Sequence, residues 1–270
     1  MNLELLDLAT TIARQAGELA LRRRAEGVTV AASKSSLEDI VTEADRETED
    51  LIRALLAEAR PDDGILGEER DSVVGTSGLT WVVDPIDGTV NYLYGIRQYA
   101  VSIAVVEGEP DPARWNALAG VVFNPAMDEL FSAAAGGAAS GGGATLNGSP
   151  IQVAPAVKLS QALIGTGFGY RAERRVEQAT TLVGLIAHIR DIRRQGSAAL
   201  DLCDVASGRL NGYFEQGLQP WDHAAGALIA EEAGAWVGGM HGARASQSFV
   251  MAAEPSLAVA LEDAVRECRA

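Results

Sequence analysis

The segment WVVDPIDGTVN at residues 81–91 constrains this chain more than any other. An apolar run ends at Asp84, Pro85 stiffens the backbone, and a second carboxylate follows at Asp87. We expect a strand that leads into a rigid turn, with both carboxylates and the carbonyl of Ile86 directed at one point. Hard oxygen ligands of this kind suit Mg²⁺, Mn²⁺ or Ca²⁺ and not zinc or copper. The segment therefore predicts a divalent-cation site, and a plain Asx-type turn after a buried strand is the alternative.

Further acidic residues stand at the ends of predicted elements. Glu68 and Glu69 follow a short apolar run and Gly67, where a solvated acidic turn is the alternative to a metal ligand. Asp222 opens an apolar helix, where an aspartate commonly caps the N-terminus and its free oxygen can also face a metal ion. Glu215 ends a predicted strand, either as an exposed charge or as a contact to a ligand.

Two short segments are candidates for holding an anion or a hydroxyl group. Gly88 and Thr89 follow the two carboxylates, at a point where backbone N–H groups can open toward an anion. Gly196, Ser197 and Ala198 open a predicted helix after a cluster of arginines, and helix capping is the alternative role for them.

The charge balance restricts the partners of this chain. It has 22 lysine and arginine residues against 37 aspartate and glutamate residues, so the formal net charge is −15. Binding to nucleic acid depends on neutralising phosphates with basic side chains, so we expect no nucleic-acid partner. A small phosphorylated molecule can still bind where local cations invert the negative field.

The cysteines and the apolar runs indicate a compartment. Cys203 and Cys268 fit no zinc-binding spacing, and a reducing compartment is the simplest inference. The N-terminal segment has acids early and no apolar run of signal-peptide length, and no stretch approaches the length of a membrane span. We expect a cytoplasmic protein that makes no contact with a membrane.

Apolar periodicity and turn residues predict alternating helices and short strands. The predicted helices cover residues 5–19, a segment with apolar residues at 51–56 that stops at Pro61, then 173–188, 197–206, 222–233 and the chain from about 256. The predicted strands cover residues 65–66, 81–83, 101–106, 119–123, 130–132, 163–165, 191–193 and 212–215.

These elements predict a layered α+β or mixed α/β fold. The composition shifts near residue 150, which predicts an N-terminal subdomain over 1–152 and a C-terminal subdomain over 153–270 within one compact unit. The glycine-rich segment 133–149 is predicted to be a surface hairpin that turns at Asn147-Gly148.

Five segments in order resemble the inositol monophosphatase family of Mg²⁺-dependent, lithium-sensitive phosphatases. They are KSSLEDIVTEAD at 34–45, GEE at 67–69, WVVDPIDGTVNY at 81–92, GSAALDLCDVASGRLNGYFE at 196–215 and WDHAAGALIAEEAG at 221–234. With the helices between them they cover nearly the whole chain, and the combination of DPIDGT with WD and a helix is highly specific. The resemblance implies a layered αβαβα sandwich and a homodimer.

The resemblance also implies a role for each candidate residue. For metal binding it implies Glu68, Asp84, Asp87 and Asp222, together with the carbonyl of Ile86. For the attacking water it implies Asp45 and Thr89, with Glu69 near a weaker third metal ion. For the substrate it implies Gly88 and Thr89 at the phosphate, and Asp87, Gly196, Ser197, Ala198 and Glu215 at or beside the hydroxyl groups. The implied cofactor is Mg²⁺, two or three ions per subunit, with Mn²⁺ as a substitute.

The implied reaction is hydrolysis of myo-inositol monophosphate to inositol and phosphate by a metal-activated water. The same chemistry on histidinol phosphate, fructose 1,6-bisphosphate or a 3′-phosphoadenosine nucleotide is the alternative. A second alternative is a catalytically idle binding partner. Glu215 favours the inositol type, because a carboxylate accepts hydrogen bonds from polyol hydroxyls and repels a second phosphate. The chain departs from the family pattern at Arg70, at His223 and in the loop 109–116, which leaves the substrate detail open.

Overall fold

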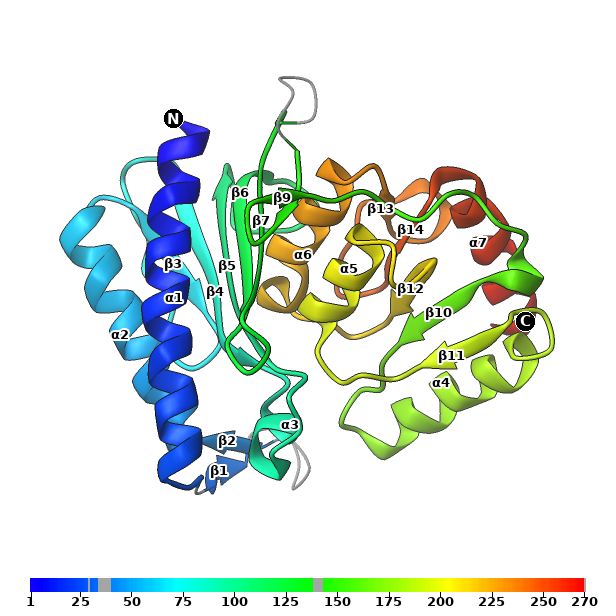
Figure 1. Ribbon diagram of the computed structural model, residues 1–270, viewed down its shortest axis with the longest axis horizontal. Helices are drawn as coiled ribbons and strands as arrows, with labels where there is room; N and C mark the ends of the chain where they lie inside the picture. The colour runs from blue at the N-terminus through cyan, green and yellow to red at the C-terminus, as the bar shows by residue number, and fades with distance from the viewer. Residues whose placement is uncertain (29, 34–39, 138–142, 270) are drawn as a thin grey trace.

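The computed structural model describes residues 1–28, 30–33, 40–137 and 143–269. The first half of the predicted KSSLEDIVTEAD motif and the middle of the predicted glycine-rich hairpin lie outside the described residues. Figure 1 shows the elements stacked in layers, with two sheets separated by one pair of helices and covered on their outer faces by others. This is the αβαβα sandwich that the sequence predicts.

The first sheet has seven strands in the order β3-β4-β5-β6-β7-β8-β9. All neighbours are antiparallel except β3 and β4, which run parallel. The strands are β3 (Gly64–Gly67), β4 (Leu79–Asp87), β5 (Ala100–Glu107), β6 (Asn116–Asn124), β7 (Glu129–Ala134), β8 (Thr145–Leu146) and β9 (Ser149–Pro150). Asn147 and Gly148 both have positive φ between β8 and β9, which confirms the predicted turn.

The second sheet has five strands in the order β11-β10-β12-β14-β13. It is mixed, because β10 runs parallel to both of its neighbours and β14 runs antiparallel to both of its own. The strands are β10 (Leu163–Thr166), β11 (Asp191–Arg193), β12 (Gly212–Glu215), β13 (Trp236–Gly238) and β14 (Val250–Ala253). A separate pair, β1 (Val30–Ser33) and β2 (Ile40–Thr42), lies beside the first sheet at the lower left of Figure 1.

The helices form the other three layers. The described ranges are α1 (Asn2–Glu26), α2 (Glu43–Ala59), α3 (Thr89–Tyr94), α4 (Ala172–Leu185), α5 (Ala198–Ala206), α6 (Pro220–Glu232) and α7 (Pro255–Arg269), with short 3₁₀ turns η2 (Leu159–Gln161) and η3 (Met240–Gly242). Helices α1 and α2 cover the outer face of the first sheet, α5 and α6 fill the space between the sheets, and α4 and α7 cover the second sheet (Figure 1).

Apolar cores join the layers. Ile12 of α1 and Ile52 of α2 pack with Trp81 on the first sheet. A second core joins the first sheet to α5, α6 and the second sheet, and a third joins the second sheet to α7. The amphipathic faces predicted for 5–19 and 51–56 lie in the first of these cores, which explains why the periodicity located those helices correctly.

The structure corrects two details of the sequence interpretation. The DPID sequence does not form a turn after a strand, because β4 continues to Asp87. Strands β1, β2, β13 and β14 and helix α3 were not predicted. Within the described ranges, no helix is both long and apolar enough to cross a bilayer. The division into subdomains at residue 152 stays a prediction.

Candidate metal and substrate site

A cavity of about 770 Å³ opens between the two sheets and gathers most of the predicted site residues. Its lining includes Glu68, Asp84, Ile86, Asp87, Gly88, Thr89, Gly196, Ser197, Ala198, Glu215 and Asp222. Asp45 and Glu69 do not line the cavity; Asp45 is hydrogen-bonded to Thr89, which does, and Glu69 follows Glu68 in the chain. The cavity therefore brings together predicted residues that lie more than half of the chain apart in sequence, from Glu68 to Asp222.

A bulge in β4 places two carboxylates on the same side of the first sheet. Asp84 pairs with Ser102 and Asp87 pairs with Ala100, so three steps along β4 match two steps along β5. Because side chains alternate along a regular strand, residues three apart would otherwise face opposite sides. The N–H of Ile86 donates to Asp84 Oδ1 at 3.0 Å, an Asx-type hydrogen bond that forms here within the bulge of the strand and not in a turn after it.

The parallel pair β3 and β4 brings Glu68 to the same place. Gly67 at the end of β3 lies opposite Val83 in β4, so the next residues, Glu68 and Asp84, emerge side by side. Burial is the main cause that raises the pKa of Asp84, and the neighbouring Glu68 raises it further through its charge and a hydrogen bond. The solvated acidic turn predicted as the alternative for Glu68 does not describe a side chain that lines the cavity.

The start of α5 holds the carboxylate of Asp87. Ser197 is the N-cap of α5, and its hydroxyl donates to Asp87 Oδ2 at 2.6 Å. The N–H of Ala199 donates to the same oxygen at 2.7 Å. Burial raises the pKa of Asp87 to about 6, and these donors oppose that rise because they stabilise the charged form. Asp87 thus links the first sheet to the helix layer.

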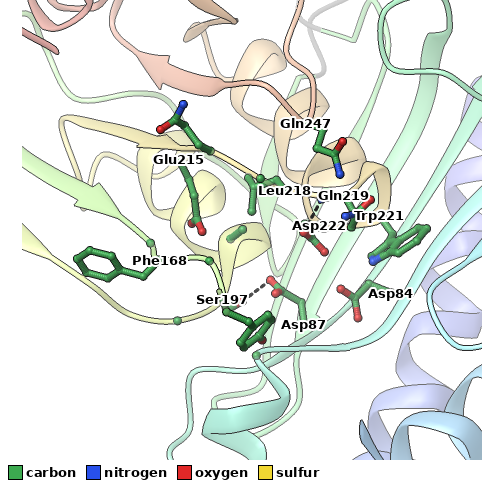
Figure 2. A pocket seen from close by; sticks show the side chains of 18 of the residues that line it. Asp84, Asp87, Phe168, Ser197, Glu215, Leu218, Gln219, Trp221, Asp222 and Gln247 are labelled. Carbon is green, nitrogen blue, oxygen red and sulfur yellow. Dashed lines mark hydrogen bonds between the residues drawn. The ribbon is translucent and has the colours of Figure 1, made fainter. Parts of the chain in front are cut away.

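The start of α6 holds Asp222 in the same way. Asp222 is not the N-cap, which is Gln219; it stands one turn later, and its Oδ2 accepts the N–H of Gln219 at 2.7 Å in a capping box. Pro220 occupies the first turn, where its missing N–H costs nothing. Figure 2 shows the side chains of Asp84, Asp87 and Asp222 directed into the same part of the cavity.

These carboxylates crowd one wall of the cavity. Burial raises the pKa of Asp84 and of Asp222 well above the ordinary aspartate value, and the neighbouring acids raise both further. Two carboxylates about 4 Å apart repel by about 4 kcal/mol at an effective dielectric constant of about 20. In the part of the chain that the structure describes, no three His, Cys, Asp or Glu side chains are placed so that they could hold one metal ion together. A wall of mutually repelling carboxylates with a nearby carbonyl nevertheless fits hard divalent cations, whose charge removes the repulsion.

Thr89 and Asp45 form a hydrogen-bonded pair beside this wall. Thr89 Oγ1 lies 3.1 Å from Asp45 Oδ1 and 3.1 Å from the carbonyl oxygen of Ile86. The hydroxyl and the N–H of Thr42 both donate to the other oxygen of Asp45, in the capping box of α2. Asp45 is 0 % exposed, and burial raises its pKa to about 6. The pair is therefore a fixed hydroxyl backed by a carboxylate that can gain a proton near neutral pH.

Glu215 stands on the opposite wall, at the end of β12. Its Oε2 accepts the hydroxyl of Tyr213 at 2.7 Å. Burial raises the pKa of Glu215 to about 7, while Tyr213 and the charge of Arg194 oppose that rise. Gly167 makes room for this carboxylate, because a Cβ at that position would overlap Glu215 Oε2. Glu215 lines the cavity and is not the exposed strand-end charge of the alternative interpretation (Figure 2).

Several other residues line the cavity that were not predicted as site residues. They are Phe168–Arg171, Arg174, Gln216–Gln219, Gln247 and Ser248. Gln247 and Ser248 precede β14, a strand that was not predicted, so no sequence signal pointed to them.

Comparisons with known proteins agree with the geometry. The sequence profile of the inositol monophosphatase family matches residues 1–269. Inositol-1-monophosphatase SuhB of Mycobacterium tuberculosis is 46% identical over 231 residues, which cover 83% of this chain and 77% of that protein. Nus factor SuhB of Xylella fastidiosa is 41% identical over 242 residues, covering 89% of this chain and 83% of that protein. The crystal structure of extragenic suppressor protein suhB from Bartonella henselae is 34% identical, covers 98% of this chain and 99% of its own, and superposes with a TM-score of 0.86.

Proposed function

The chain belongs to the inositol monophosphatase family, and we propose that it hydrolyses myo-inositol monophosphate to inositol and phosphate with Mg²⁺ as cofactor. One observation carries the proposal: the cavity sets a wall of carboxylates, Asp84, Asp87 and Asp222, opposite a single carboxylate, Glu215. The first wall suits cations that hold a phosphate, and the second suits hydroxyl groups.

Glu68, Asp84, Asp87 and Asp222, with the carbonyl of Ile86, would hold two or three Mg²⁺ ions, and Mn²⁺ would substitute. When bound, the ions neutralise the phosphate and lower the pKa of the attacking water and of the leaving alcohol. The N–H groups of Gly88 and Thr89 add neutral donors for the phosphate oxygens.

Thr89 and Asp45 would orient the attacking water. The Thr89 hydroxyl can accept from the water while it donates to Asp45 Oδ1, 3.1 Å away. The water oxygen would then form the new bond to phosphorus while the ester P–O bond breaks. The water's proton would pass toward Asp45, and the inositol oxygen would leave as an alkoxide that takes a proton from solvent water to become the alcohol. Glu69, the neighbour of Glu68 in sequence, would lie near a third metal ion that is bound less tightly.

The substrate's hydroxyl groups would contact the opposite wall. Glu215 accepts from two neighbouring hydroxyls, and Asp87 and the Gly196–Ala198 segment approach the ring from the side of α5. A second phosphate placed at Glu215 would be repelled, which favours inositol monophosphate over fructose 1,6-bisphosphate and 3′-phosphoadenosine nucleotides. Histidinol phosphate has no free hydroxyl, so it would leave the hydroxyl contacts of this wall unused.

A phosphate-release assay across these substrates, with Mg²⁺ and with chelator, tests the proposal. We expect the highest kcat/KM on myo-inositol 1-phosphate and no release without a divalent ion. Mg²⁺-independent release would contradict the proposed cofactor, and a higher kcat/KM on a bisphosphate would contradict the proposed substrate.

Lithium provides a second test. We propose that Li⁺ inhibits uncompetitively, by replacing a more weakly held Mg²⁺ after the reaction at a site that offers only oxygen ligands. Parallel double-reciprocal plots at millimolar Li⁺ are the expected result. Complete indifference to Li⁺ would show that the weaker cation site differs from the one proposed.

The assembly and the cellular setting stay predictions. We propose a homodimer in the cytoplasm that binds neither nucleic acid nor membrane. A molar mass equal to that of one chain, measured by light scattering, would contradict the dimer. The name of one relative, Nus factor SuhB, is the observation that favours a role as a binding partner as the alternative. An inactive chain in the phosphate-release assay would favour that alternative.

A further inference from the structure

A buried ion pair lies directly behind the Glu68-Glu69 segment and has no part in the proposed reaction. Glu49 stands one turn after Asp45 in α2 and is 0 % exposed. Arg53, the next turn along, donates from Nε to Glu49 Oε1 at 2.7 Å. Burying a charged carboxylate close to other carboxylates costs folding free energy, even when it is paired with an arginine. The presence of the Glu49–Arg53 pair here therefore suggests that it has a function.

The second oxygen of Glu49 holds the backbone of that segment. The N–H of Glu69 donates to Glu49 Oε2 at 2.7 Å, across 20 residues of sequence. Arg53 adds a contact on the far side, from Nη2 to the carbonyl oxygen of Arg70 at 3.2 Å. A charge-assisted hydrogen bond to a backbone N–H is stronger than a neutral one, and this one fixes a peptide unit directly after Glu68.

Gly67 fixes the backbone before Glu68. A Cβ at Gly67 would overlap Glu49 Oε1 and would stand 3.0 Å from Arg53 Nη2. The backbone therefore rests against the ion pair, and only a residue without a side chain allows that approach. Glu68 is held on both sides by the same buried pair.

From these contacts we infer that Glu49 is a positioning residue for the metal site. Its carboxylate fixes the 67–69 backbone against α2 and so sets where the Glu68 carboxylate enters the cavity beside Asp84. Since Asp45 lies one turn earlier in the same helix, α2 also sets the spacing between Glu68 and the Asp45–Thr89 pair. The inference rests on the proposed function, because it takes Glu68 as a metal ligand.

Asp50 supplies a matched control. It is the next residue in α2 and also pairs with an arginine of the same segment, at 2.9 and 2.6 Å to Arg70. Asp50 is exposed, and it holds a side chain and not the backbone beside Glu68. A general effect of removing charge from α2 would appear in both variants, whereas positioning of Glu68 depends on Glu49 alone.

The test measures Mg²⁺ binding to the metal-free full-length chain by titration calorimetry. Loss of a group that orients a metal ligand costs about 10- to 100-fold in metal affinity, so we expect Glu49→Gln to raise the Kd for Mg²⁺ by at least about 10-fold. Asp50→Asn should leave the Kd within about twofold, as expected for an exposed pair. In Glu49→Gln, kcat should recover at saturating Mg²⁺ because every ligand remains, and a purely structural defect would not produce that recovery.

The outcomes separate this inference from the proposed function. An unchanged Kd in Glu49→Gln, or an equal loss in Asp50→Asn, overturns the positioning role. A wild-type chain that binds no Mg²⁺, or a Glu68→Gln variant that binds it as tightly as wild type, overturns the metal site itself. If circular dichroism shows that Glu49→Gln does not fold, Arg53→Gln takes its place, and a wild-type Kd in that variant overturns the inference.

Discussion

Asp87 and Glu215 face the same cavity from opposite walls and are held in different ways. Asp87 accepts from a hydroxyl and a backbone N–H at the start of α5, a helix that follows it by more than a hundred residues. Glu215 accepts from the hydroxyl of Tyr213, two residues away in its own strand. Asp87 stands beside Asp84 and Asp222, whereas Glu215 enters the cavity from the opposite wall (Figure 2).

The difference indicates that the two walls of the cavity have different functions. The wall around Asp87 concentrates like charges that only cations can relieve, so it should govern whether the reaction takes place at all. The wall around Glu215 offers one acceptor to a substrate, so it should govern which alcohol is accepted. Variants on the two walls should therefore change different quantities.

Asp87→Asn should have the largest effect. An amide is a weaker, neutral ligand, and its NH₂ group would face the donors of Ser197 and Ala199. Because cation binding contributes several kcal/mol to transition-state stabilisation, we expect Mg²⁺-dependent turnover to fall by more than about 1,000-fold. Phosphate release measures the loss, and circular dichroism should show a folded chain. Full activity in this variant would contradict the claim that the wall around Asp87 governs whether the reaction takes place.

The metal-free protein should lose stability as the pH rises. Burial raises the pKa of Glu215 to about 7 and that of Asp87 to about 6, from ordinary values of 4.5 and 3.8. The folded state binds these protons more tightly than the unfolded state, so the stabilisation is complete below those ordinary values and disappears as the pH passes about 6 and then about 7. For Glu215 alone the change is up to about 3 kcal/mol.

Thermal unfolding between pH 4.5 and pH 8, with chelator and with Mg²⁺, measures this slope. Bound Mg²⁺ should abolish the contribution of Asp87 to this pH dependence of stability and leave the contribution of Glu215 unchanged. A slope that Mg²⁺ leaves unchanged would show that the ion does not bind on the Asp87 wall.

Glu215→Gln should change selectivity while Mg²⁺ dependence survives. A lost charged hydrogen bond costs about 1–3 kcal/mol, so the preference for inositol phosphate over glycerol phosphate should fall by that amount. The ratio of kcat/KM on the two substrates is the measurement. An unchanged ratio would mean that Glu215 contacts no substrate hydroxyl, and the inositol assignment would lose its support from this wall.

His223→Leu should have the smallest effect, and it should fall on stability. His223 follows Asp222, is 2 % exposed, and its Nε2 has no hydrogen-bond partner among the described residues. An unpaired buried polar atom costs about 1–3 kcal/mol, part of which an apolar side chain recovers, so unfolding should require about 1 kcal/mol more. Chemical denaturation measures this gain. A drop in turnover as large as that of Asp87→Asn would contradict this prediction, because it would mean that His223 takes part in catalysis.

The sequence predicted the carboxylates better than it predicted their surroundings. Asp84, Asp87 and Asp222 stand next to strong local signals: an apolar run, a proline and a helix start. The bulge that aligns Asp84 with Asp87 depends on pairing with β5, which a local pattern cannot show. The predicted turn after the strand was therefore wrong, whereas Asp84, Ile86 and Asp87 all line the same cavity.

The elements that were not predicted lack the local sequence signals of a strand or a helix, each for its own reason. Strand β14 is buried along its whole length, so its apolar run lacks the alternation that identifies a half-buried strand. Helix α3 has only six residues and begins after Gly88 in a left-handed conformation, so it shows no recognisable cap or period. Gln247 and Glu49 are placed at or near the site by tertiary contacts, and no motif in the adjacent sequence identifies them as site residues.

The bond from Ala199 to Asp87 also bears on how the chain reaches its final state. It joins residues 112 positions apart, and closing so long a loop is slow because its entropy is lost before the contact is made. The strands of the first sheet can pair with near neighbours well before α5 arrives. During refolding, hydrolytic activity should therefore return after most of the secondary structure, so that recovery of turnover reports the final assembly step.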